Sequence, residues 1–137
     1  ERPESSFVAK FLGEINCLVG TVEQQIGNLV TISLGENGKI QLLSESHEIK
    51  NNRCYVRPEK IFFDTGKEQK EPVNSLEGTL VSIDFFGSYT RYQIQLTDGT
   101  LFKLSLHHRK PKQHKHFIGD SVRVLFPISD VFQIHEN

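Results

Sequence analysis

The sequence predicts a mainly β protein, a closed or nearly closed antiparallel barrel built from two small β modules. Two observations lead to this fold class. Apolar and polar residues alternate with a period of two along several short runs, as in strands with one face on a core. Turn dipeptides of the hairpin type separate these runs at short intervals.

The alternating runs define the expected strands. Because neighbouring side chains in a strand point to opposite faces, the pattern places Phe85 and Tyr92 on the core-facing side. Hairpins are expected at Gly27-Asn28, Asn37-Gly38 and Asp98-Gly99, where glycine permits a positive φ. The clearest runs are Val30–Leu34, Val81–Phe85, Tyr92–Leu96, Phe102–Leu106 and Val122–Phe126.

The chain divides into four parts on this pattern. Residues 1–14 form a junction with a short helix over Phe7–Leu12, which Ser5 or Ser6 caps and Gly13 ends. Residues 15–63 form the first β module and residues 76–137 the second. The polar stretch 64–75, which contains Gly and Pro, is expected to be the linker. The modules share a general plan, but the sequence alone shows no clean repeat.

Composition limits the classes of function. The 137 residues carry a net charge of −1, so no overall attraction to nucleic acid or anionic lipid is expected. No apolar run approaches the length of a membrane span, and the absence of Met predicts a processed protein or an excised fragment. Cys17 and Cys54 lie in apolar, strand-like stretches, so both are predicted to be buried and reduced.

The sequence contains no recognisable catalytic motif. The segment Gly35–Ile40 has the wrong spacing for a phosphate-binding loop and lacks the hydroxyl residue that would hold Mg²⁺. It is better interpreted as a hairpin turn. We therefore expect that this chain alone is not an enzyme and does not hydrolyse ATP.

Two segments raise the question of a binding site. The stretch His107–His116 contains four of the six histidines, interleaved with Lys and Arg. A metal site, a site for an anionic partner and a solvated loop are all open, and the cations weigh against a metal. In the second segment, the aromatics Phe85, Phe86, Tyr89 and Tyr92 lie near Arg91. They fit either base stacking by a nucleic-acid-binding barrel or core packing, and the low net charge weighs against nucleic acid.

The order of several short motifs resembles one protein family, over essentially the whole chain. The segment Phe7–Asn16 followed by Gly20-Thr21-Val22 is similar to the junction after the ATPase domain in ABC importers of polyamine, ferric-iron and maltose type. Val56–Ile61 is similar to that family's V-R-P-E-x-I motif. The second module resembles the family's second barrel segment, through Leu76–Val81, Phe86-Gly87, Tyr92, Asp98-Gly99 and Gly119–Val122. The long basic loop His107–His116 departs from the family pattern.

This resemblance implies a TOBE-type region with an OB-fold-like barrel, which regulates the ATP-binding subunit of an importer, with a slight preference for polyamine transport. The implied partners are a second copy of the chain, the subunit's own nucleotide-binding domain, membrane permease subunits and a small-molecule regulator, with no nucleic acid. The implied location is cytoplasmic, peripheral to the inner membrane through the permease. No cofactor is expected here, because ATP and Mg²⁺ belong to the missing domain. The candidate interface and regulatory residues are Glu14, Asn16, Arg57, Glu59, Arg91 and Tyr92.

Two other classes of function stay open at this point. A free-standing OB domain that binds a small oxyanion would use Lys103, Arg123 and the basic loop. A single-stranded nucleic-acid-binding OB domain is the third alternative.

Overall fold

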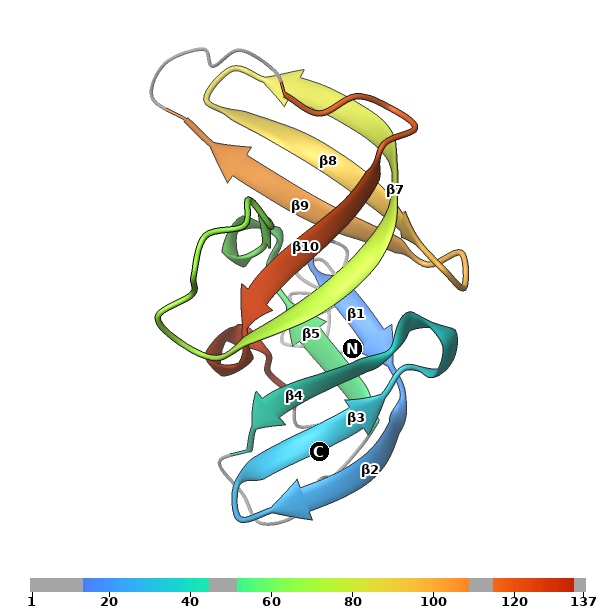
Figure 1. Cartoon of the computed structure of the whole chain (residues 1–137), viewed down its shortest axis with the longest axis vertical. Helices are drawn as coiled ribbons and strands as arrows, with labels where there is room; N and C mark the ends of the chain where they lie inside the picture. The colour runs from blue at the N-terminus through green and yellow to red at the C-terminus, as the bar shows by residue number, and fades with distance from the viewer. Residues whose placement is uncertain (1–13, 45–51, 109–114, 135–137) are drawn as a thin grey trace, which may run out of the picture.

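The computed structural model describes residues 14–44, 52–108 and 115–134. Within this part of the chain the fold is almost entirely β, as the sequence predicts (Figure 1). A two-stranded, a three-stranded and a five-stranded sheet pack together, in the strand orders β1-β5, β2-β3-β4 and β6-β10-β7-β8-β9. The strands are β1 (Asn16–Val19), β2 (Thr21–Ile26), β3 (Leu29–Ser33), β4 (Lys39–Leu43), β5 (Arg53–Val56), β6 (Phe62–Phe63), β7 (Val73–Phe86), β8 (Tyr89–Leu96), β9 (Leu101–His107) and β10 (Ser121–Pro127).

The expected hairpins are present. β2 and β3 meet at Gly27, and β8 and β9 meet at Gly99, with positive φ at both glycines. The turn between β3 and β4 contains the short 3-10 helix η1 (Gly35–Asn37) and ends at Gly38, which also has positive φ. Two further 3-10 helices, η2 (Pro58–Lys60) and η3 (Ile128–Asp130), follow β5 and β10. They occupy matching places in the two halves of the chain.

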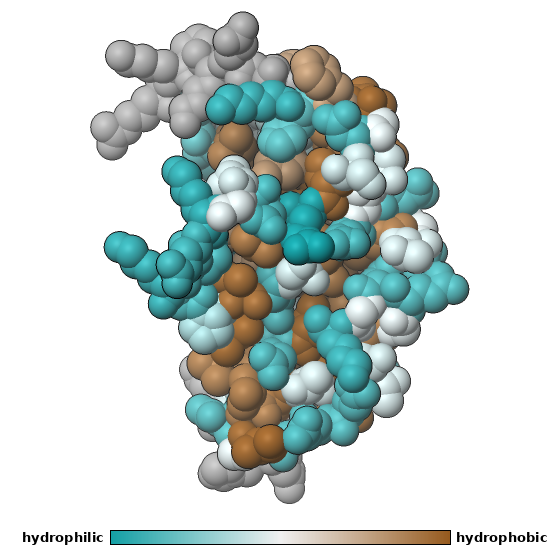
Figure 2. Space-filling model, in the orientation of Figure 1, coloured by the Kyte–Doolittle hydropathy of each residue, from teal (hydrophilic) through white to brown (hydrophobic). Residues whose placement is uncertain are grey.

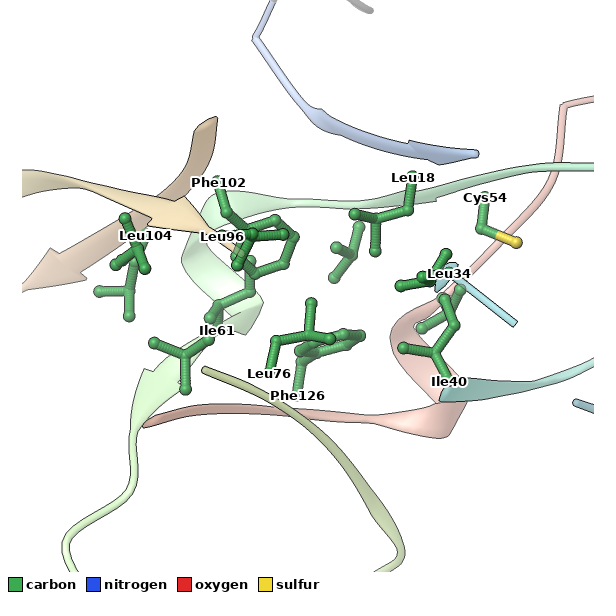
Figure 3. Close-up of a cluster of buried hydrophobic side chains, with 14 of the residues drawn as sticks. Leu18, Leu34, Ile40, Cys54, Ile61, Leu76, Leu96, Phe102, Leu104 and Phe126 are labelled. Carbon is green, nitrogen blue, oxygen red and sulfur yellow. The ribbon is translucent and has the colours of Figure 1, made fainter. Parts of the chain in front are cut away.

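One hydrophobic cluster runs through both halves of the molecule (Figure 3). Its fully buried side chains come from β3, β4 and β5 in the first half of the chain and from β7 to β10 in the second. Alternation along the strands supplies most of them, as the sequence predicts. The largest are Phe102, Phe126, Ile32, Ile40, Leu42, Leu76, Leu80, Ile94 and Leu104.

Three expectations are wrong in detail, and a fourth is not tested. Tyr92 is buried as predicted, but Phe85 has 69% of its surface exposed, because β7 continues past the end of the core. Cys17 is exposed while Cys54 is buried. Cys54 pairs with Leu18, and Cys17 precedes Leu18 on β1, so its side chain points to the opposite face of the strand. The linker is shorter than expected, since β7 begins at Val73. The helix predicted over Phe7–Leu12 lies outside the described residues.

The sheets of the described residues do not close into one barrel through strand pairing. A β-bulge interrupts the register of β7 with β8 between Leu80 and Ser82. Bulges increase local twist, and here the bulge separates the core half of β7 from its outer half. No helix in the described part of the chain is long and apolar enough to cross a membrane.

Candidate interaction surfaces

Two buried asparagines connect the edges that strand pairing leaves open. The side-chain amide of Asn16 donates to the Lys103 carbonyl at 2.8 Å, and its oxygen accepts from the Lys103 N–H at 2.7 Å. Asn74 makes the same pair of bonds with the backbone of Gln41, at 2.9 and 2.7 Å. Both asparagines are buried, with 4% and 5% of their surface exposed. We call these contacts the asparagine clasps.

Each clasp joins the first strand of one half to an edge strand of the other half. Asn16 on β1 reaches β9, and Asn74 on β7 reaches β4. The two asparagines open the related segments Asn-Cys-Leu-Val-Gly-Thr and Asn-Ser-Leu-Glu-Gly-Thr, at 16–21 and 74–79. The clasps therefore belong to an internal repeat that sequence inspection missed. The shared N-x-L-x-G-T spacing was the signal that would have revealed it.

The end of each repeat pairs with a strand of the other repeat. Phe62, after η2, pairs with Leu125 on β10, while Phe132, after η3, pairs with Tyr55 on β5. The second contact has two backbone hydrogen bonds. The Tyr55 N–H donates to the Phe132 carbonyl at 2.8 Å, and the Phe132 N–H donates to the Tyr55 carbonyl at 2.9 Å. The residues 16–62 (the first repeat) and 74–132 (the second repeat) thus complete each other's sheets.

The predicted residues near this seam have different surroundings. Glu14 and Glu59 are exposed, at the start of the described chain and in η2. Arg57 is half-buried, and its guanidinium lies 5.5 Å from the centre of the Phe132 ring. Asn16 makes the clasp described above. The structure thus brings Asn16 and Arg57 to the boundary between the repeats and leaves both glutamates facing solvent.

The second repeat carries a longer hairpin than the first. Nine positions separate Gly78 from the turn at Gly87, whereas seven separate Gly20 from Gly27. The added length takes β7, β8 and β9 beyond the core. At the end of this extension a row of rings crosses the three strands: Phe86 stacks on Tyr89, and Tyr89 on His107, each with centroids 5.1 Å apart.

Arg91 lies beside this row. Its guanidinium carbon is 5.9 Å from the centre of the Tyr89 ring, and its Nε donates to the Ser105 hydroxyl at 2.7 Å. Tyr92 follows on the opposite face of β8, where it is buried, and burial raises the pKa of its phenol. The structure therefore separates these two predicted residues: Arg91 faces outward and Tyr92 is part of the core.

The basic histidine-rich stretch lies partly outside the described residues. His107 belongs to the row of rings, and His116 stacks on Phe63 with centroids 3.9 Å apart and contacts Tyr92 edge-on. Hydrophobic residues also surface at the upper end of the molecule in Figure 2, beside the grey segment. In the described ranges, no group of three or more His, Cys, Asp or Glu is placed to hold a metal ion.

A shallow polar groove runs over the outer face of β7, β8 and β10. Glu77, Thr79, Gln95 and Ser121 are among the residues that line it. At its side, Arg123 donates to the Glu77 carboxylate through Nε at 3.1 Å and lies 4.0 Å from Asp64. The hydrogen bond to Glu77 raises the pKa of Arg123, and these carboxylates satisfy its charge. Among the residues that the structure describes, the groove is therefore without the unopposed cation that an oxyanion would need.

Comparison with known families decides what kind of domain this is. The family model described as TOBE domain matches residues 54–133, which is more than half of the chain. The chain belongs to the TOBE domain family. The match begins at β5, so one TOBE unit contains the end of the first repeat together with the whole of the second.

Among curated proteins, the TOBE chain is similar to ATP-binding subunits of importers. It is 31% identical over 123 residues to the spermidine/putrescine import ATP-binding protein PotA 2 of Pseudomonas aeruginosa, covering 88% of this chain and 34% of that protein. It is 30% identical over 125 residues to PotA of Chromobacterium violaceum, covering 89% and 35%. The chain thus spans about a third of the length of these relatives, and the resemblance to a TOBE region of an ABC importer is confirmed.

A solved structure supports the fold. The TOBE chain superposes on the cytoplasmic molybdate-binding protein ModG with a TM-score of 0.64, covering 85% of this chain and 93% of that one. The sequence identity is 21%, so the likeness concerns the fold alone. It confirms the expected OB-like architecture.

Proposed function

We propose that this chain is the regulatory and self-associating domain of the ATP-binding subunit of an ABC importer that transports polyamines. The observation that carries the proposal is the similarity to spermidine/putrescine import ATP-binding proteins along about nine tenths of the chain. A TOBE domain in this position does not perform the ATPase chemistry. ATP and Mg²⁺ are held by the nucleotide-binding domain, and this chain itself has no cofactor.

The domain acts by binding differently to the states of the transporter. A contact that is stronger in one state of the nucleotide-binding dimer shifts the equilibrium toward that state, by the difference in binding free energy. Candidates for contacts with the nucleotide-binding domain are the exposed Glu14 and Glu59 and the half-buried Arg57. A second copy of the chain and the permease subunits are the other partners, and a small-molecule regulator would act through the same equilibrium. The location is cytoplasmic, held at the inner membrane by the permease.

Uptake of radiolabelled spermidine and putrescine tests this function. Cells whose gene lacks the segment for residues 15–134 should take up either polyamine more slowly, or with altered regulation, than cells with the intact gene. Uptake of an unrelated amino acid serves as the control for general energy coupling. Unchanged uptake of both polyamines under all growth conditions would contradict the proposal.

The oxyanion alternative receives no support from the described residues. Lys103 lies on β9, where its backbone holds Asn16, and Arg123 lies on β10 beside two carboxylates, so the two cations do not converge. Thermal shifts with molybdate, sulfate and phosphate test this alternative, because a bound ligand raises Tm. We expect no shift with any of the three.

A further inference from the structure

The end of the long hairpin in the second repeat presents an outward sheet face that is not covered by other described elements. We define the hairpin surface as Asp84, Phe86, Tyr89, Arg91 and His107. The register places these residues on one face, because Asp84 pairs with Arg91, Phe86 with Tyr89, and Tyr89 with His107. Phe86 keeps 52% of its surface exposed. The first repeat has no counterpart, because its hairpin ends before this point.

The arrangement of the rings decides what kind of partner fits. Tyr89 has Phe86 on one side and His107 on the other, nearly parallel at 20° and 21°. Both faces of the central ring are therefore occupied within the chain. A single-stranded nucleic acid binds through open ring faces, on which successive bases stack. In the hairpin surface only the two end rings, Phe86 and His107, have an outer side, which suits a small contact with protein side chains better than a run of stacked bases.

The charges on this face are complementary to those of a second copy. Asp84 and Arg91 are cross-strand neighbours of opposite sign, yet among the described residues no ion pair joins them. Asp84 accepts from Ser82, and Arg91 points toward Ser105 on the far side. In a twofold contact every residue pair occurs twice, so Asp84 of each copy can face Arg91 of the other. The net charge of −1 adds little repulsion between copies.

We infer that a second copy of this chain docks on the hairpin surface, with Phe86 as the apolar anchor and two reciprocal Asp84–Arg91 pairs beside it. This inference rests on the self-association in the proposed function and identifies the surface through which the two copies bind. The rings and their neighbours offer roughly 300–400 Å² per copy, so the total lies below the approximately 1,200 Å² of stable complexes. The contact is consequently weak and depends on concentration.

Sedimentation velocity of the 137-residue chain over a concentration series tests the inference. Phe86→Ser should raise the dimer dissociation constant at least tenfold, because it removes the apolar anchor. The matched control is Ile26→Ser at the tip of the first repeat's hairpin, where Ile26 is 66% exposed. This control should associate like the wild type. Both side chains are exposed, so both variants should stay folded; Phe86→Ser should lower Tm by only a few degrees, because it loses the stacking contact with Tyr89.

Charge exchange makes the test specific for the proposed pairing. Asp84→Arg should weaken association as strongly as Phe86→Ser, because it places two cations together. The double exchange Asp84→Arg with Arg91→Asp should restore association to within about threefold of the wild type. Association is restored only if positions 84 and 91 of different copies meet across the interface. If the two residues merely stabilised the fold of one copy, the double exchange would not restore association.

Three results would overturn the inference. The first is a Phe86→Ser variant that dimerises like the wild type, which leaves self-association intact but places it elsewhere. The second is a strictly monomeric wild type throughout the series. The third is salt-sensitive binding of labelled oligothymidine that is lost in Phe86→Ser, which would assign the surface to nucleic acid. None of these changes the polyamine-uptake result, so failure of the surface and failure of the importer function are distinguishable.

Discussion

Replacing Asn74 with alanine removes one of the two asparagine clasps. The substitution deletes two hydrogen bonds, of 2.7 and 2.9 Å, and leaves the N–H and carbonyl of Gln41 without these partners. Each buried group that loses its partner costs about 1–3 kcal/mol, and because Gln41 is only half-buried its two groups together should cost about 3 kcal/mol. For a chain of this length, that loss lowers Tm by roughly 10 °C. Thermal and urea unfolding followed by circular dichroism measure both quantities.

Two variants make this prediction discriminating. Asn37→Ala removes a solvent-exposed side-chain bond to the Asp98 N–H and should cost less than about 1 kcal/mol. Asn74→Asp directs a carboxylate oxygen at the Gln41 carbonyl, which disfavours the charged form and raises the pKa of the introduced carboxyl in the folded state. A group with a raised folded pKa binds protons on folding, so this variant should gain stability as the pH falls. An Asn74→Ala variant no less stable than Asn37→Ala would refute the role of the clasps.

Two further predictions concern close packing and thiol reactivity. Gly78→Ala should destabilise the fold by several kcal/mol, because an added Cβ would lie 2.4 Å from a backbone oxygen of β8. Gly87→Ala meets open space and should cost only about 1 kcal/mol, from the strain of a left-handed backbone. Urea unfolding compares the two variants, and equal losses of stability would contradict the close packing at Gly78. Ellman's reagent at pH 8 should modify only the exposed Cys17, because burial raises the pKa of the Cys54 thiol to about 12. Rapid modification of both thiols in the folded protein would be inconsistent with the burial of Cys54.

The fold class was accessible from the sequence because strand periodicity and turn chemistry are local. The hairpin at Gly99 and the burial of Tyr92 follow directly from them. Periodicity assigns a side chain to a face, but it does not show where the core under that face ends. Phe85 lies on the same side of the sheet as Tyr92, but beyond the bulge and outside the hydrophobic cluster, although its cross-strand neighbour Thr90 is buried. Its exposure is therefore a property of the tertiary arrangement.

The candidate surfaces were only partly accessible from the sequence. The family resemblance points to Asn16, whereas the polar composition of residues 64–75 assigns its equivalent Asn74 to the linker, because a polar residue between modules suggests a loop. The partners of the two asparagines, Lys103 and Gln41, are 87 and 33 positions away. No local pattern specifies contacts over such separations. The stacking of Tyr89 likewise depends on the register of three strands, which the sequence does not state.

An antibody against the 137-residue chain, applied to fractionated lysate of the source organism, tests the central claim most directly. If the chain is part of an import ATPase, the antibody detects a protein much heavier than 15.7 kDa, in the membrane fraction and purifying together with a permease. A soluble protein of the chain's own mass, with no permease attached, would contradict the account and indicate a free-standing OB-fold protein.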